Sequence, residues 1–249
     1  MNSKSENIVI NFESVSKTFY INTNPVDSIR EKFFNIFSNS NLKTIHALKN
    51  ASFNISKGDF VGIIGHNGSG KSTLLKLIIG SIQPDKGGKI ETTGKIIRLA
   101  LGMGFDPNLT ARDNIYVNGS IMGLSFKEIG KRFDKILTFA GLTNFVDTPI
   151  KFYSSGMVSR LAFSISMHIE SEVLLIDEFF GGVGDIDFQE KSHKAFTESI
   201  IKNKTVLFVS HNLELIQTYC NKVIIFHQGE LIFYGNPKES IELYKKLKA

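Results

Sequence analysis

Gly65-His66-Asn67-Gly68-Ser69-Gly70-Lys71-Ser72-Thr73, or GHNGSGKST, is the stretch that decides the fold. It fits the phosphate-binding loop pattern GxxxxGK[ST]. The apolar residues 60–64 before it predict a buried strand, and residues 72–79 after it predict a helix that Gly80 ends. A strand, a glycine-rich loop and a helix in this order predict a site for nucleotide phosphates.

Each part of this loop has an expected role. Its glycines allow successive backbone N–H groups to point at the phosphates, and the helix N-terminus adds partial positive charge. Lys71 should reach the β- and γ-phosphates, and the Ser72 hydroxyl should ligate Mg²⁺. The predicted ligands are therefore ATP and Mg²⁺.

An acidic pair, Asp177 and Glu178, follows a second apolar run at residues 173–176. That run predicts a parallel strand covered on both faces, which places both carboxylates at its C-terminal end. Asp177 should hold Mg²⁺, and Glu178 should act as general base or polarise the attacking water. The alternative is a solvated acidic pair, but two carboxylates just beyond a buried run need a compensating cation.

The segment Tyr153-Ser154-Ser155-Gly156-Met157 (YSSGM) precedes a predicted helix that continues to about Ile165. One interpretation is a turn whose serines, Ser154 and Ser155, cap that helix. The segment also resembles the signature loop of ABC ATPases, in the variant found in polysaccharide exporters. Both interpretations can hold together, because a helix N-terminus with hydroxyl groups is suited to bind a γ-phosphate.

The resemblance to ABC ATPases implies further roles. Ser154, Ser155, Gly156 and Met157 would bind the γ-phosphate held by a partner subunit, so two chains would form a homodimer around two ATP molecules. His211, which follows the apolar run 205–209, resembles the switch histidine that contacts the γ-phosphate, although a lone histidine is often structural. Phe19 resembles the aromatic residue on which adenine stacks. Tyr20 is the adjacent candidate, and either ring could be plain core.

Other stretches are similar to the nucleotide-binding subunits that export O-antigen, capsule and teichoic acid. They are the residues 47–50, 62–65, 102–110 (GMGFDPNLT), 114–119, 153–157, 184–185 and 188–189. This resemblance implies an ATPase that works with a separate integral-membrane permease and exports undecaprenyl-linked polysaccharide, peripherally bound at the cytoplasmic face of the inner membrane. No nucleic-acid partner is expected. The alternatives are another exporter, of lipid or drug, and a non-transport ABC protein.

Two positions depart from the family pattern. The loop that joins the core to the helical lobe usually carries a glutamine that senses Mg²⁺, but the chain has no Gln between Gln83 and Gln189, and Ala100 stands where relatives often place an acidic residue. Asp185 is expected to be the D-loop aspartate, although it follows Glu178 by one residue more than usual.

Composition agrees with one ATPase domain. The chain has 249 residues, a formal net charge of +5 and a pI of about 9.1, which weakly favours an anionic ligand or a membrane surface. Its single cysteine, Cys220, excludes an internal disulfide and fits a reducing compartment. No apolar run approaches the roughly 20 residues that cross a bilayer, and no signal-peptide pattern begins the chain. We expect a short form without a carbohydrate-binding domain, because little sequence follows His211.

The expected fold is α/β: a P-loop NTPase cassette with a RecA-like core, an antiparallel β-subdomain and a helical subdomain, all in one domain over 1–249. The antiparallel part is predicted from residues 8–56 and 89–99, the helical subdomain from about 109–168, and a closing turn and helix from 232–247. The apolar residues of the helical part, among them Phe126, Ile129, Phe133, Ile136, Leu137 and Ala140, recur at helical spacing and should form core.

An amphipathic insertion is predicted at about residues 22–43. Ile29, Phe33, Ile36 and Phe37 recur at helical spacing opposite charged residues. The helix could lie at the membrane beside the permease and gate the substrate, or its apolar face could pack on the cassette's own sheet.

Overall fold

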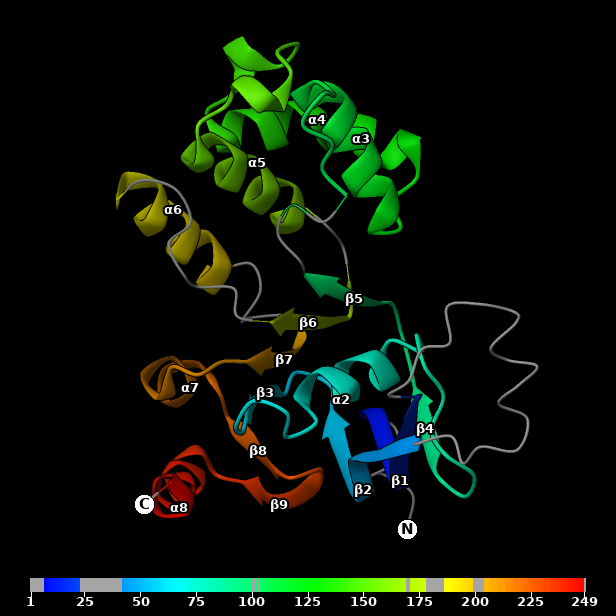
Figure 1. Ribbon diagram of the computed structural model, residues 1–249. Helices are drawn as coiled ribbons and strands as arrows, with labels where there is room; N and C mark the ends of the chain where they lie inside the picture. Colours follow the sequence, from blue (N-terminus) through cyan, green and yellow to red (C-terminus); the bar gives the residue numbers. More distant parts are fainter. Residues whose placement is uncertain are drawn as a thin grey trace, which may run out of the picture.

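The structure is a computed structural model that describes residues 7–22, 42–99, 102, 104–168, 171–177, 186–198 and 204–248. A twisted sheet and the helices beside it make up the lower part of the molecule in Figure 1, and a group of helices lies beyond the sheet's β5 edge. The candidate site is built at the carboxyl ends of strands in this sheet.

The core of the sheet is parallel. β3 (Phe60–Ile64) lies between β7 (Thr205–Val209) and β8 (Lys222–His227), and β6 (Val173–Asp177) follows on the other side of β7. β5 (Ile96–Leu99) pairs with β6 at the edge. Every residue of β3 and β7 is buried, as expected for parallel strands covered on both faces. The strands predicted at 60–64, 173–176 and 205–209 are confirmed.

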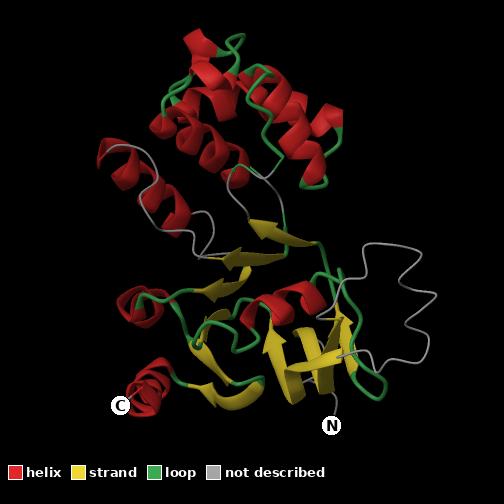
Figure 2. Cartoon of the chain, in the orientation of Figure 1, coloured by secondary structure: helices red, strands yellow, loops and turns green. Residues whose placement is uncertain are grey.

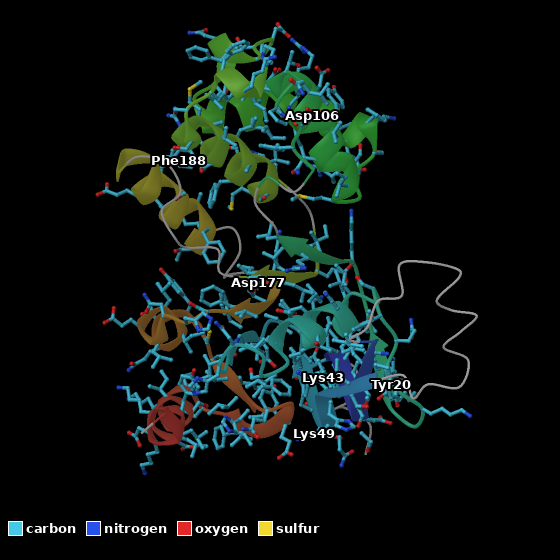
Figure 3. The ribbon with its side chains drawn as sticks, viewed as in Figure 1. Tyr20, Lys43, Lys49, Asp106, Asp177 and Phe188 are labelled. Atoms are coloured by element: carbon cyan, nitrogen blue, oxygen red, sulfur yellow. The ribbon has the colours of Figure 1, made fainter. Side chains whose placement is uncertain are left out.

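The antiparallel part contains β1 (Ile8–Asn22), β2 (Leu42–Ser56) and β4 (Lys89–Thr92). Through β9 (Glu230–Gly235) it joins the core, so the described strands form one nine-stranded sheet in the order β4-β1-β2-β9-β8-β3-β7-β6-β5. β2 meets β9 at the pair Lys49 and Glu230, whose side chains form an ion pair at 3.1 Å. Lys49 is labelled low in Figure 3.

Two predictions about this sheet are wrong. Residues 89–99 do not form one antiparallel segment: a turn that includes Gly94, at φ 81°, separates β4 from β5, and β5 pairs in parallel with β6. The reason is burial, since Ile97 and Leu99 lie in the core whereas β4 is mostly exposed. The closing segment predicted from Ile232 begins inside strand β9, which pairs antiparallel with β8 before α8 begins.

The predicted amphipathic helix lies outside the described residues, apart from its ends. Asn22, the last residue of β1, pairs with Leu42, the first residue of β2. Residues 23–41 connect these two paired residues. Whether they form the helix stays a prediction.

Alternation along the strands creates two faces. Val61 and Ile63 of β3 belong to the cluster formed with α2 (Lys71–Ile78) and the antiparallel strands. Phe60 and Ile64 belong to the cluster on the other face, which includes residues of α6 (Ile186–Phe196), α7 (Leu213–Tyr219) and α8 (Pro237–Lys248). Figure 1 shows α2 on one side of the core strands and α7 and α8 on the other.

Helices α3 (Ala111–Ile121), α4 (Phe126–Ala140) and α5 (Ser155–Met167) form the helical lobe with the short 3-10 helices η2 (Thr143–Phe145) and η3 (Ile150–Phe152). Figure 2 shows these helices gathered away from the strands. The apolar stripe of α4 is core at four positions: Ile129, Ile136, Leu137 and Ala140. Phe126 departs from that prediction. It is 70% exposed because it lies in the first turn, outside the core, where it stacks on Tyr116 at 5.5 Å.

Candidate functional site

A cavity of about 420 Å³ gathers residues from four parts of the chain. The phosphate-binding loop, which follows β3, forms one part of its wall. Asp177, the last residue of β6, forms another, and Val209 and His211 contribute from the end of β7 and the residues that follow that strand. The β1–β2 hairpin supplies the remaining wall. In Figure 3, Asp177 is labelled at the end of β6, in the part of the sheet that lies toward the helical lobe. The lining residues are Phe19, Ile45, Ala47, Asn67, Gly68, Gly70, Lys71, Ser72, Thr73, Asp177, Val209 and His211.

The loop holds its lysine by backbone carbonyls. Lys71 is 9% exposed, and its Nζ donates to the Gly65 carbonyl at 2.7 Å and to the His66 carbonyl at 2.9 Å. These bonds satisfy a buried ammonium group and place it beside the start of α2. The carbonyl groups of the phosphate-binding loop therefore hold the Lys71 side chain at the wall of the cavity.

The start of α2 is open to a ligand. Its N-cap residue, Gly70, has φ 111° and provides no side-chain hydrogen bond to the first turn. The first N–H groups of a helix have no partner inside the helix, and its dipole favours an anion there. These donors fit a phosphate group.

Gly65, His66 and Ser69 do not line the cavity, although the sequence places them in the loop. Gly65 and His66 contribute the carbonyls that hold Lys71. The His66 ring lies 6.1 Å from the ring of His227 and 5.8 Å from that of Tyr244 on α8, between ring centroids. Its side chain therefore lies beside β8 and α8 and not in the cavity.

The two aromatic candidates of β1 are distinguished by the structure. Phe19 lines the cavity, whereas Tyr20 points elsewhere and is 71% exposed. Ile45 pairs with Phe19 across the β1–β2 ladder and lines the same wall. Sequence reasoning missed Ile45, because only the register between two strands places it opposite Phe19.

Asp177 has an unexpected partner. Arg98 Nη2, on β5, donates to Asp177 Oδ2 at 2.8 Å, and the two side chains are 32% and 25% exposed. Arg98 is thus the compensating cation that a carboxylate beyond a buried strand requires. The sequence contained a signal for it, since an arginine in the otherwise apolar segment 96–99 needs a partner.

Glu178 and Asp185 lie outside the described residues, as does Ala100. Their expected roles as general base and D-loop aspartate stay predictions. His211 lies on the cavity wall one residue beyond the buried Ser210, where it faces the same space as Asp177 and Lys71.

The YSSGM segment forms the N-terminus of α5 and does not line the cavity. Ser154 is the N-cap, and its Oγ accepts from the Met157 N–H at 3.2 Å, so the capping interpretation is correct for Ser154. Ser155 is the first helical residue instead of a cap. Tyr153 is held before it by a 2.6 Å hydrogen bond to the Phe145 carbonyl, and burial raises the pKa of its phenol.

The residues present fit Mg²⁺. Asp177 and Ser72 line one cavity, and a carboxylate and a hydroxyl are oxygen ligands of the kind that this ion takes. Within the described part of the chain, no group of three His, Cys, Asp or Glu side chains could hold a metal by itself. Mg²⁺ with few protein ligands and several phosphate oxygens is the arrangement expected at a nucleotide site.

Comparison with known proteins agrees with this geometry. A family model described as ABC transporter matches residues 48–181. The O-antigen export system ATP-binding protein RfbB of Klebsiella pneumoniae is 40% identical over 245 residues, which cover 97% of this chain and 99% of that protein. The teichoic acids export ATP-binding protein TagH of Bacillus anthracis is 37% identical over 238 residues, or 96% of this chain and 42% of that protein.

A solved structure has the same fold. The dimeric ATP-binding cassette MJ0796, bound to ADP and Pi in a post-hydrolysis state, superposes with a TM-score of 0.67 and 23% identity, over 92% of this chain and 98% of that chain.

Proposed function

We infer the function of this chain from its family: it belongs to the ABC transporter family, of which it is an ATP-binding and ATP-hydrolysing subunit. We propose that it drives the export of a lipid-linked polysaccharide, carried on undecaprenyl phosphate, through a separate membrane permease. The observation that carries this proposal is the end-to-end similarity, at 40% identity, to an ATP-binding protein of O-antigen export. The similarity to a teichoic acids exporter supports the same class of cargo.

We propose that two copies of the chain act together. The N-terminus of α5 lies on the helical lobe and outside its own cavity, so its N–H groups are available to a phosphate held by another copy. The dimeric state of the solved cassette supports this arrangement. In it, Ser154, Ser155, Gly156 and Met157 of one copy would complete the site of the other, with Asp185 near the dimer contact.

The chain's own residues would divide the chemistry as follows. Adenine stacks on Phe19, and the loop with the start of α2 binds the phosphates, toward which Lys71 extends. Glu178 accepts the proton of the attacking water, and His211 stabilises charge on the γ-phosphate. Mg²⁺, held by Asp177 and Ser72, would neutralise charge on the transferred phosphoryl group.

The proposed location is the cytoplasmic face of the inner membrane, at the permease. This follows from the exporter family, because an ATPase subunit acts where its permease and cellular ATP meet. Separately, none of the helices among the described residues combines the length and the hydropathy needed to cross a bilayer.

Glu178→Gln tests the chemistry. The variant should bind ATP as the wild type does and hydrolyse it at least about 100-fold more slowly, since an amide cannot accept the proton. Glu172→Gln is the matched control, because Glu172 is an exposed carboxylate just before the other end of β6. ATPase activity of Glu178→Gln close to that of the control would contradict the assignment.

A cellular experiment tests the cargo. A strain that lacks the gene should accumulate lipid-linked polysaccharide inside the cell, and the wild-type gene should clear it while the Glu178→Gln gene does not. Accumulation of another lipid, or of a drug, would identify a different exporter. If the strain that lacks the gene accumulates no cargo, although the purified wild-type chain hydrolyses ATP, the export proposal is contradicted altogether.

A further inference from the structure

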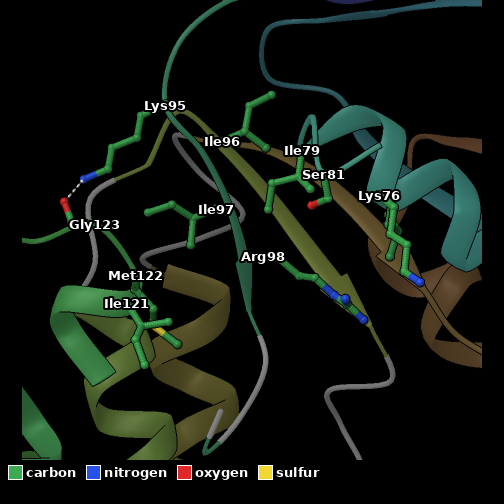
Figure 4. Close-up of a pocket in the computed structure, with 11 residues that line it drawn as sticks. Lys76, Ile79, Ser81, Lys95, Ile96, Ile97, Arg98, Ile121, Met122 and Gly123 are labelled. Carbon is green, nitrogen blue, oxygen red and sulfur yellow. Dashed lines mark hydrogen bonds between the residues drawn. The ribbon is translucent and has the colours of Figure 1, made fainter. Parts of the chain in front are cut away.

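The segment that leads from the sheet to the helical lobe places one charged side chain at the nucleotide site. Arg98 lies on β5, the edge strand after which the chain continues into the lobe, and it contacts Asp177 at the end of the neighbouring strand. Arg98 and Ile97 leave β5 on opposite sides, and Ile97 faces the helical lobe (Figure 4). Arg98 therefore shares with Asp177 the face of the sheet that α2 covers.

The Arg98–Asp177 pair separates two cavities. Asp177 lines the nucleotide cavity, and Arg98 lines a second cavity of about 450 Å³ between α2, β5 and the end of α3. Lys76, Lys95 and Arg98 are the charged residues of that second cavity, and no carboxylate is among its described lining residues. Asp177 is thus the counter-ion toward which this arginine is drawn.

The ion pair between Arg98 and Asp177 is weak enough to separate when a ligand competes for the carboxylate. It has a single hydrogen bond, from Nη2 to Oδ2, and the buried Nε of Arg98 has no partner among the described residues. A bidentate pair would be stronger and more rigid. Both side chains are about one quarter to one third exposed, so water screens the attraction.

We propose that Arg98 competes with the divalent metal for the Asp177 carboxylate and thereby lowers the metal affinity of the nucleotide site. This inference rests on the proposed function, in which Asp177 is a metal ligand. Before Asp177 can hold a metal with its full charge, Arg98 must release Oδ2. Release removes a side-chain contact between β5 and the end of β6, while the ladder between the strands stays, so metal binding at the nucleotide site alters the strand after which the chain continues into the helical lobe. Arg98 is then a positioning residue that acts through Asp177.

The test is a Mg²⁺ titration of the full chain with a fluorescent, non-hydrolysable ATP analogue. Arg98→Met should raise the apparent Mg²⁺ affinity about tenfold, because the Asp177 carboxylate no longer has to give up a charged hydrogen bond before it binds the metal. Arg98→Lys keeps the charge and should stay within about twofold of the wild type. Lys76→Met removes an exposed cation from the same cavity without touching Asp177, and it should also change the affinity less than about twofold.

The decisive comparison is made in a protein that also carries Asp177→Asn. There, adding Arg98→Met should no longer alter the Mg²⁺ affinity, because the carboxylate for which the arginine and the metal compete is absent. A tenfold gain that persists with Asp177→Asn, or a gain equal to that of Lys76→Met, would show only a general charge effect and overturn the proposal. A loss of affinity in Arg98→Met would show that Arg98 orients Asp177 for the metal, which also overturns it.

Two further measurements keep the outcomes separate. Metal-free thermal unfolding shows whether Arg98→Met folds, and Arg98→Gln gives the same Mg²⁺ comparison if it does not. Wild type and Lys76→Met must bind the analogue in a Mg²⁺-dependent manner. Failure there would refute the proposed nucleotide function, whereas failure of the Arg98 comparison alone would refute only the competition.

Discussion

At the residue scale, Gly70 shows how backbone geometry makes the phosphate loop. Its φ of 111° lies in the region that L-residues with a side chain rarely adopt. A Cβ at this position would also lie 2.5 Å from the Ala47 carbonyl oxygen on β2. The loop can therefore pass between α2 and the hairpin only if this residue is glycine. The glycine pattern in the sequence predicted the loop, but not the close approach of β2.

Gly70→Ala should abolish ATP binding, because both the backbone strain and the contact with Ala47 oppose the loop conformation. Gly68→Ala is the matched control: Gly68 also has positive φ, at 77°, but its Cβ would meet no atom within 4 Å. We expect the control to lose about 1 kcal/mol of stability and to keep measurable binding. Isothermal titration with ATP, after circular dichroism to check folding, compares the two. Equal affinities would contradict this account.

At the scale of elements, Asn114 organises the entrance to the helical lobe. It is fully buried on α3, and its Nδ2 donates to the carbonyls of Asp106, Leu109 and Thr110. Its Oδ1 accepts from the Asp106 N–H at 2.9 Å. One side chain thus provides hydrogen-bond partners for the backbone groups of the loop that precedes α3. The capping box formed by Thr110 and Asp113 adds further hydrogen bonds at the start of the helix.

Asn114→Ala should lower the free energy of unfolding by about 2–4 kcal/mol, because it leaves several buried backbone groups unsatisfied. Asn108→Ala, in the same loop, should change it by less than about 0.5 kcal/mol, since Asn108 is exposed. Urea denaturation of both variants measures the difference. A loss below about 1 kcal/mol for Asn114→Ala would show that water replaces its hydrogen bonds.

At the scale of the whole molecule, the helical lobe is attached to the sheet through α6. Phe188 of α6 contacts the rings of Phe139 on α4 and Phe163 on α5, at 5.7 and 5.8 Å. Lys191 of α6 donates to the Phe139 carbonyl at 2.9 Å and lies over its ring. His168 closes α5 at this junction, where its ring contacts Phe139. Stability of the junction is therefore coupled to the charge of one histidine.

Burial lowers the pKa of His168, and the cations Lys135 and Arg132 lower it further, while its bond to the Ser164 carbonyl opposes this. Asp134 and Lys191 line the same surface pocket as the His168 ring. Since the folded pKa lies below the unfolded value, the contribution of neutral His168 is complete above about pH 6.5 and is lost as pH falls through the folded pKa.

His168→Gln should therefore make stability less dependent on pH below neutrality. Urea unfolding at pH 7.5 and at pH 5.5 measures how much the free energy of unfolding of each protein falls between the two pH values. This decrease should be larger for the wild type than for the variant. His46→Gln is the control, because His46 is an exposed histidine on β2. If both variants show the same pH dependence as the wild type, His168 does not titrate differently on folding.

The sequence by itself determined the elements whose signal is local. Residues 60–80 predicted strand, loop and helix almost to the residue, because glycine spacing and apolar runs act over neighbouring positions. The same reasoning placed Asp177 and His211 at strand ends, and parallel strands bring their carboxyl ends together at one edge.

Tertiary structure alone decided what depends on pairing between distant segments. The register of β1 and β2 put Ile45 opposite Phe19, the burial of Ile97 and Leu99 moved β5 from the antiparallel part to the core, and that move brought Arg98 to Asp177. Even where a residue such as Arg98 signals that it needs a partner, the identity of that partner has no local signal, since it depends on which strand lies beside which. Strand order reflects the free energy of burying whole faces, and a pattern along one segment does not contain it.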